Sequence, residues 1–304
     1  MWFASPRLAG ALAAVSLVAG VARGAPTKAP LMDWPDLMGR PLPQPTKHIA
    51  YGPDPLQFGE LWVPEGKGPF PTVVMVHGGC WLSGVAKLSI MNYAAEDLRR
   101  RGFAVWNVEY RGVDRPGGGY PGTFQDVAAA ADDLLTIAKA NNLRTDRVLA
   151  LGHSAGGHLA LWLAARARLP AGSPLKTAKP LPIFSVVSLG GLPDLASEAG
   201  HGVCGEGTVA RLVGSPNPTH PDVYADTSPA DLGAGNDREV LISGADDPLA
   251  TPAMADAYAA KMKAKGAFIR SFKLKDTGHV ELISPGTLGW SRAVDAVASL
   301  IGPS

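Results

Sequence analysis

Short apolar runs alternate with longer segments of helical spacing along most of the chain, and this alternation is the strongest constraint on its fold. The apolar runs that we expect to form buried strands are 72–76, 104–108, 148–151, 184–189 and 239–243, with a more alternating run at 268–274. Helical spacing is found over 90–101, 123–141, 155–168, 252–265 and 286–301. Strands that alternate with helices predict an α/β fold with a mostly parallel sheet and helices on both faces. Ligands bind at the carboxyl ends of the strands in such sheets.

The N-terminal 24 residues have the pattern of an export signal. Arg7 precedes an apolar run over 8–22, and Ala22 and Gly24 place small residues where a signal peptidase cuts. We expect a signal peptide over 1–24 and a secreted or periplasmic protein; a membrane anchor is the alternative for a run that is short for a bilayer span. We expect the proline-rich residues 25–50 to form an extended lead-in and residues 51–304 to form one domain. Within that domain, the irregular stretch 193–237 is either a lid or pocket wall, or a set of surface loops.

Charge and cysteine content exclude several classes of partner. The 304 residues include 28 Lys and Arg against 27 Asp and Glu, a balance that predicts neither a nucleic acid nor an anionic membrane as partner. Histidine spacing typical of a metal site, a C-x-x-C motif and a phosphate-binding Walker pattern are absent, so we expect no metal and no cofactor. Cys80 and Cys204 are able to pair in an exported protein, but the sequence leaves their pairing open, as it does the oligomeric state.

A G-x-S-x-G motif, Gly152-His153-Ser154-Ala155-Gly156, joins an expected strand to an expected helix. This is the position of a nucleophile elbow, in which small neighbours let the strand and helix approach closely around a strained serine. The N–H groups at the start of the helix then point at the reacting centre. The motif predicts Ser154 as a nucleophile; an ordinary glycine-rich turn with a serine N-cap is the alternative.

A second motif, His77-Gly78-Gly79-Cys80-Trp81, directly follows the expected strand 72–76. Acyl transfer needs N–H donors that face the developing oxyanion, and a glycine-rich loop in this place supplies them. We expect Gly79 and Cys80 to provide two donors, with Ala155 as the third, and His77 to organise the loop. A glycine-rich β-turn without this role is the alternative. Trp81 and Tyr120 are candidates for lining the pocket or for simple packing.

The remaining candidates follow the last two expected strands. Asp246 and Asp247 come after 239–243, and either can orient a histidine while the other caps a turn before Pro248. His279 comes after 268–274 and is the expected base, because the order serine, acid, histidine is typical of this architecture. Three other histidines are set aside: we expect His158 to be a packed core group, and His201 and His220 to be solvated loop residues.

Together these motifs resemble the α/β-hydrolase superfamily and, more closely, the bacterial esterases grouped with kynurenine formamidases, feruloyl-type acetyl esterases and carboxylesterases. The similarity extends over about residues 71–279 and includes 77–81, 109–112, 120–121, 126–127, 152–160, 247–249 and 278–279. The family's acid is usually the aspartate three residues after the strand-terminal glycine and just before a proline, which implies Asp247. Cys80 departs from hormone-sensitive-lipase-like relatives, which carry a third glycine there; formamidase-like relatives vary at that position and keep the tryptophan.

The resemblance implies that residues 51–304 are an α/β-hydrolase catalytic domain. It implies a serine hydrolase that cleaves esters of small or medium acyl groups through Ser154, His279 and Asp247 and an acyl-enzyme intermediate. The expected partner is a small-molecule ester, without nucleic acid and without a membrane beyond the export signal. Two alternatives stay open: an amidase, arylformamidase or small peptidase on the same triad, and a non-catalytic binding protein that keeps the fold.

Overall fold

The computed structural model describes residues 1–2 and 30–302, except for the side chains of residues 200 and 201. The expected signal peptide therefore lies, beyond its first two residues, outside the described part of the chain. A compact unit begins at Leu31.

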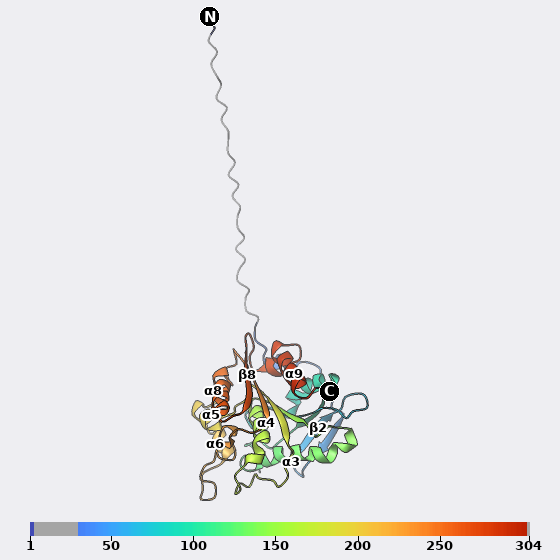
Figure 1. Cartoon of the computed structure of the whole chain (residues 1–304), viewed down its shortest axis with the longest axis vertical. Helices are drawn as coiled ribbons and strands as arrows, with labels where there is room; N and C mark the ends of the chain where they lie inside the picture. Colours follow the sequence, from blue (N-terminus) through green and yellow to red (C-terminus); the bar gives the residue numbers. More distant parts are fainter. Residues whose placement is uncertain (3–29, 303–304) are drawn as a thin grey trace. The chain divides into compact units, whose positions relative to one another are not determined.

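One sheet of eight strands runs through the unit, in the order β1-β2-β4-β3-β5-β6-β7-β8 (Figure 1). β1 pairs with β2 and β2 with β4 in antiparallel orientation, and all the other neighbours are parallel. The strands are β1 (Lys47–Ala50), β2 (Phe58–Trp62), β3 (Thr72–Val76), β4 (Ala104–Val108), β5 (Val148–His153), β6 (Ile183–Leu189), β7 (Arg238–Gly244) and β8 (Phe268–Leu274). The predicted α/β-hydrolase fold, with a mostly parallel sheet, is confirmed.

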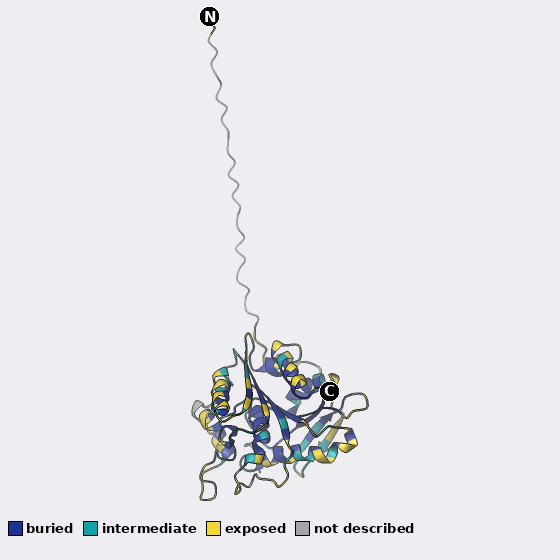
Figure 2. Cartoon of the chain, in the orientation of Figure 1, coloured by how far each residue is buried: buried dark blue, intermediate teal, exposed yellow. Residues whose placement is uncertain are grey.

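Helices cover both faces of the sheet (Figures 1 and 2). α3 (Gly122–Ile137), α4 (Ala155–Ala165) and α8 (Pro252–Lys263) pack on one face, and α2 (Asn92–Arg100) and α9 (Leu288–Ile301) pack on the other. Side chains along β3 alternate between the two cores, with Val74 and Val76 in the first and Val73 and Met75 in the second. Burial on both faces explains why the central strands read as continuous apolar runs. None of the described helices has the length and apolar character needed to cross a bilayer.

Shorter elements complete the unit. They are α1 (Trp34–Met38), η1 (Leu88–Met91), η2 (Lys139–Asn141), η3 (Arg166–Arg168), α5 (Leu195–His201), α6 (Thr208–Val213), α7 (Pro229–Leu232) and η4 (Val280–Ile283). Three of them, α5, α6 and α7, lie in the stretch 193–237 that the sequence predicts to be irregular.

The expected extended lead-in, 25–50, contains ordered structure. α1 begins after Asp33, whose carboxylate accepts the N–H of Asp36 at 3.1 Å, and β1 pairs with β2 at the edge of the sheet. β1 is largely exposed, so its sequence carries no apolar alternation that would predict a strand. The boundary at residue 50 therefore falls at the end of an edge strand, not between a lead-in and a domain.

Candidate active site

Ser154 lies at the turn from β5 to α4 in a strained backbone conformation. Its φ is 55° and its ψ is −124°, a region that residues with side chains rarely adopt. The turn is so tight that only glycine fits at position 156. A Cβ added there would lie 2.2 Å from the carbonyl oxygen of Val76 and 2.4 Å from that of His77. The N–H of Ser154 donates to the carbonyl of Leu189 on β6 at 2.9 Å, which ties the turn to the sheet. This is the elbow geometry that the motif predicts.

Asp247 and His279 meet after the ends of β7 and β8. His279 Nδ1 donates to Asp247 Oδ2 at 2.6 Å, and both side chains are buried. The other oxygen, Asp247 Oδ1, accepts the N–H groups of Leu249 at 2.8 Å and Ala250 at 3.0 Å, so the carboxylate is held in one orientation. With Nδ1 engaged, Nε2 is the nitrogen of His279 that is left to accept a proton. Of the two aspartates, the structure brings Asp247 to the histidine.

The turn after β3 brings backbone N–H groups to the same place. Gly79 and Cys80 line one pocket with Ser154 and His279, and the N–H of Leu82 closes the turn on the carbonyl of Gly79 at 2.9 Å. In the described part of the chain, neither the N–H of Gly79 nor that of Cys80 has a hydrogen-bond acceptor. Ala155 is the first residue of α4, a position whose N–H has no intrahelical acceptor. The three predicted donors thus belong to the two turns that meet at Ser154.

His77 fixes the start of this turn. Its Nε2 donates to Glu109 Oε1 at 2.7 Å, and its ring stacks on Tyr110 with centroids 4.4 Å apart. Burial alone would raise the pKa of the Glu109 carboxyl, but His77 and the N–H groups of Leu88 and Tyr110 hold that pKa below its ordinary value. A charged, buried carboxylate therefore anchors the loop that carries Gly79 and Cys80.

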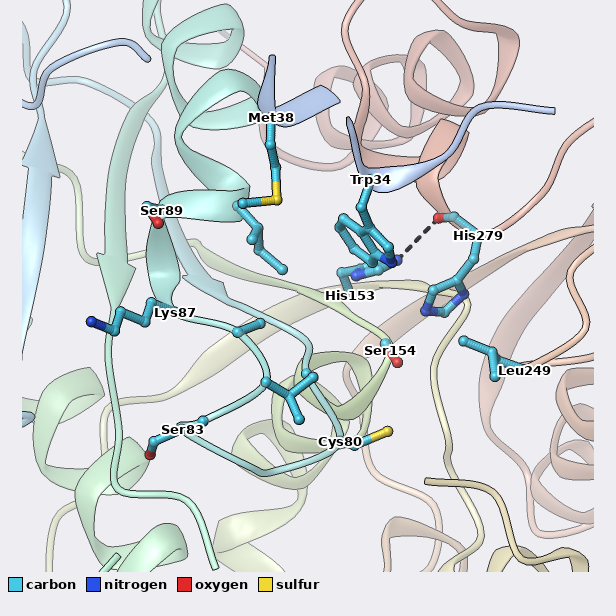
Figure 3. A pocket seen from close by; sticks show the side chains of 15 residues that line it. Trp34, Met38, Cys80, Ser83, Lys87, Ser89, His153, Ser154, Leu249 and His279 are labelled. Atoms are coloured by element: carbon cyan, nitrogen blue, oxygen red, sulfur yellow. Dashed lines mark hydrogen bonds between the residues drawn. The ribbon is translucent and has the colours of Figure 1, made fainter. Parts of the chain in front are cut away.

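His153, the residue before the serine, contacts His279 through a hydrogen bond and its ring. Its Nε2 donates to the backbone carbonyl of His279 at 3.1 Å, drawn as a dashed line in Figure 3, and the two rings lie 4.3 Å apart. Burial and the neighbouring His279 push the pKa of His153 well below its ordinary value, so His153 stays neutral. Sequence reasoning did not find this role, because the second position of G-x-S-x-G accepts any residue.

The pocket beside Ser154 has a volume of about 530 Å³ and mainly apolar walls. Figure 3 shows Trp34, Leu249 and Met38 around it, with Ser154 and His279 toward one end and Lys87 and Ser89 toward the other. Further apolar wall is supplied by Val85 and Ile90. Trp34 also sets its ring edge-on to His153 at 6.1 Å.

α1, which carries Trp34 and Met38, is tied to the loop of His279. Glu281 accepts the N–H of Met32 on Oε1 at 2.5 Å and the N–H of Gly278 on Oε2 at 3.0 Å. One buried carboxylate thus holds both the segment that leads into the pocket wall and the residue before His279. Sequence reasoning missed this wall because α1 lies more than 100 residues before Ser154 and packs on the site only in the folded chain.

Trp81 and Tyr120, the two candidates for lining the pocket, do not line it. Trp81 is fully buried and its indole N–H donates to His158 Nδ1 at 3.2 Å. Tyr120 donates its hydroxyl to Asp226 at 2.9 Å and stacks on His220. Both belong to the packing around the site: the turn directs the Trp81 side chain into the core, and Tyr120 packs against that core.

The structure bears out the expectation for one of the other histidines and contradicts it for another. His158 is a fully buried core group, as predicted, and its Nε2 donates to the carbonyl of Thr227 at 2.9 Å. The expectation that His220 is a solvated loop residue is wrong: it is buried and its Nε2 lies 2.9 Å from Asp226 Oδ1. The side chain of His201 lies outside the described residues. Over the part of the chain that is described, no group of three His, Cys, Asp or Glu side chains is arranged to hold a metal ion.

Comparison with known proteins gives a family and a set of related folds. A model of the family described as BD-FAE matches residues 60–262. None of the curated proteins matches the sequence.

Several solved structures share the fold at low sequence identity. A truncated carbohydrate esterase from gut microbiota has a TM-score of 0.70 at 20% identity, over 84% of this chain and 95% of that chain. Esterase B from Lactobacillus rhamnosis has a TM-score of 0.69 at 19% identity, over 83% of this chain and 85% of that chain. Esterase 2 from Thermogutta terrifontis, solved with propionate bound, has a TM-score of 0.68 at 17% identity, over 88% and 99%.

Proposed function

Because the chain belongs to the BD-FAE family of α/β-hydrolase-like esterases, we propose that it hydrolyses carboxylic esters of small or medium acyl groups through Ser154, His279 and Asp247. The observation that carries the proposal is the 2.6 Å contact of Asp247 with His279, which lines the same pocket as Ser154 on its strained turn. A serine, a histidine and a buried carboxylate in this order are the parts that an acyl-enzyme mechanism requires.

In the proposed first step, His279 Nε2 takes the proton of the Ser154 hydroxyl as Oγ attacks the ester carbonyl. The oxyanion that forms accepts hydrogen bonds from the N–H groups of Gly79, Cys80 and Ala155, which are held in place before the reaction begins. His279 then returns the proton to the leaving alcohol, and Asp247 stabilises the imidazolium in between. Water repeats the sequence on the acyl-enzyme and releases the acid.

The walls of the pocket favour substrates with an apolar group. Trp34, Met38 and Leu249 surround the space next to Ser154, and a cavity of about 530 Å³ is in the range that small-molecule sites occupy. Transfer of an acyl or alcohol chain from water into such walls contributes about 0.8 kcal/mol for each buried methylene. We therefore expect an ester with a medium-length chain to react faster than the corresponding acetate.

Removal of one wall tests this placement. Trp34→Ala should lower the preference in kcat/KM for a hexanoate over an acetate ester about 15-fold, since two acyl methylenes that lose their contacts with the Trp34 ring correspond to roughly 1.6 kcal/mol. Leu42→Ala is the matched control, because Leu42 is exposed in the same segment and does not line the pocket. An unchanged preference in a folded Trp34→Ala variant would mean that the acyl chain of the substrate does not bind against Trp34.

The competing function on the same residues is amide hydrolysis, as in an amidase, arylformamidase or small peptidase. An ester and an amide with the same acyl and aryl groups separate the two. We expect kcat/KM for the ester to exceed that for the amide by at least about 100-fold, a difference of about 2.7 kcal/mol in transition-state stabilisation. Equal rates, or faster cleavage of the amide, would assign the protein to the amidases.

We also propose that the protein is exported after cleavage near Gly24. The support is the charged start and apolar run of the N-terminus, together with the disulfide that joins Cys80 and Cys204 in the structure, a pairing that the sequence leaves open. Disulfides persist in oxidising compartments and are rare in the cytosol.

A further inference from the structure

We propose that the Cys80–Cys204 disulfide positions the oxyanion-binding turn, residues 79–82, so that reduction of this bond slows hydrolysis while the fold persists. The inference rests on the proposed function, because it concerns the N–H groups of Gly79 and Cys80 as oxyanion donors. The bond joins residues 124 apart in sequence with their Cα atoms 5.2 Å apart, and Cys80 itself lines the pocket of Ser154. Nothing in the esterase reaction requires a disulfide, so its place in the pocket wall calls for a separate explanation.

The backbone of the turn is one that a free chain would avoid. Cys80 and Trp81 both have a φ of 55°, and two consecutive residues with side chains in this left-handed region are uncommon. Such conformations persist only where the surroundings over-determine them. The contacts of each residue therefore show what holds the turn in place.

Trp81 is held by the core of the domain. Its side chain is fully buried, and its indole N–H donates to His158, which in turn donates to the carbonyl of Thr227. Burial lowers the pKa of His158 to about 4, so this histidine stays neutral and keeps its Nδ1 free to accept from Trp81. This end of the turn does not depend on the disulfide.

Among the described residues, Cys80 has no side-chain hydrogen bond or core packing comparable to that of Trp81, and the disulfide is its anchor. Its partner Cys204 lies between α5 and α6, in a stretch where Gly202, Gly205 and Gly207 all have positive φ. A Cβ added to any of these three glycines would meet no atom within 4 Å, so the space around the glycines is open. Cys204 itself packs against the core, so the disulfide ties Cys80 to an anchored partner. Both cysteines are half-buried, which leaves the bond within reach of a small thiol. The disulfide is thus the one covalent restraint on the pocket side of the turn.

Reduction of the disulfide would release Cys80 from Cys204. A dithiol reductant gives two electrons and two protons to the bond, Cys80 and Cys204 become thiols, and the dithiol becomes a cyclic disulfide. Trp81 and His77 keep the turn attached to the domain. Once the disulfide is broken, the 2.9 Å hydrogen bond from the Leu82 N–H to the Gly79 carbonyl is what still opposes rotation of the Gly79–Cys80 peptide away from Ser154. Because the N–H groups of Gly79 and Cys80 are proposed to contact the oxyanion and not the ground-state ester, the loss should fall on kcat more than on KM.

The test compares the oxidised protein, the same protein reduced with a dithiol, and the Cys204→Ser variant. We expect kcat for a short acyl ester to fall at least tenfold on reduction and in Cys204→Ser, with KM changed less than about twofold. The affinity for a trifluoromethyl ketone, which forms an oxyanion with Ser154, should fall in parallel. The affinity for the corresponding secondary alcohol, which forms none, should stay the same. Thiol titration measures the extent of reduction, and circular dichroism reports folding at the assay temperature.

Two variants serve as controls. Thr208→Val removes the hydrogen bond from the Thr208 hydroxyl to the carbonyl of Cys204 at 3.0 Å but keeps the disulfide, and should retain the parental kcat. The double variant Cys80→Ser with Cys204→Ser should be slow with and without the dithiol.

Three outcomes overturn the proposal: full reduction without a change in kcat, equal losses of affinity for the ketone and the alcohol, or unfolding of the reduced protein at the assay temperature. The proposed function is tested before any reductant is added. An oxidised, folded parent that hydrolyses no ester would reject the proposed function itself.

Discussion

Replacement of Ser154 by alanine is expected to lower kcat/KM for a short acyl ester by about 10⁵-fold, which leaves only the residual catalysis of the binding site. The reason is that the acyl-enzyme cannot form without the Ser154 oxygen. The pocket walls still bind the ester, and the N–H groups of the two turns still stabilise the oxyanion that forms when water attacks it. The same variant should lose all labelling by a fluorophosphonate, which reacts with activated serines, whereas the parent should label with one equivalent. Both measurements require the variant to remain folded, which thermal unfolding checks.

The pocket offers matched serine controls for this experiment. Ser83 and Ser89 also line it, and Ser83 Oγ accepts the N–H of Gly112 at 2.8 Å. Neither lies on a strained turn as Ser154 does. We therefore expect the fluorophosphonate to label the Ser89→Ala variant as it labels the parent. A folded parent that does not label would argue against an activated serine and favour the alternative of a binding protein that keeps the fold.

The central sheet could be predicted because its strands are buried on both faces. The limits of β3, β4 and β8 match the expected runs, and β5, β6 and β7 extend the expected runs by one or two residues. β1 escaped prediction because it is largely exposed and carries no apolar alternation. β2 escaped prediction because Gly59 and Glu60 interrupt its apolar run, although its positions are buried or half-buried. α1 did carry a local signal, since Asp33 and Asp36 form a capping box around Pro35.

Some of the candidate site residues could be placed from the sequence and others could not. Ser154, Asp247 and His279 each lie in the turn or loop that follows a predicted strand, so the rule that ligands bind at the carboxyl ends of parallel strands brings them to one edge. Trp34 reaches the pocket, and Cys204 reaches Cys80, from segments without a strand register. No local sequence pattern therefore predicts their positions. The direction of a side chain was also beyond the sequence: Trp81 follows Cys80 in the turn, yet one residue lines the pocket and the other is in the core.

The identity of the acid gives the second large effect that we expect. Asp247→Asn should lower kcat by about 10⁴-fold, because an amide in place of the carboxylate disturbs the Nδ1–H tautomer of His279 and no longer stabilises the imidazolium. Asp247 Oδ1 also accepts two backbone N–H groups, so the Asn side chain is held with its oxygen on that side and its NH₂ toward His279. KM should change little, since Asp247 does not line the pocket.

Asp246→Asn is the matched control, one residue away on the same loop. The N–H of Asp246 donates to the carbonyl of Thr277 at 3.0 Å, and this backbone contact survives the substitution. We expect kcat within about threefold of the parent, because the 2.6 Å contact between Asp247 and His279 is retained. Comparable losses in the two variants would mean that both carboxylates act on His279, and a larger loss in Asp246→Asn would exchange their roles. Since the two variants differ by one position and lose the same charge, the difference in kcat isolates the contact with His279 from the electrostatics of the loop.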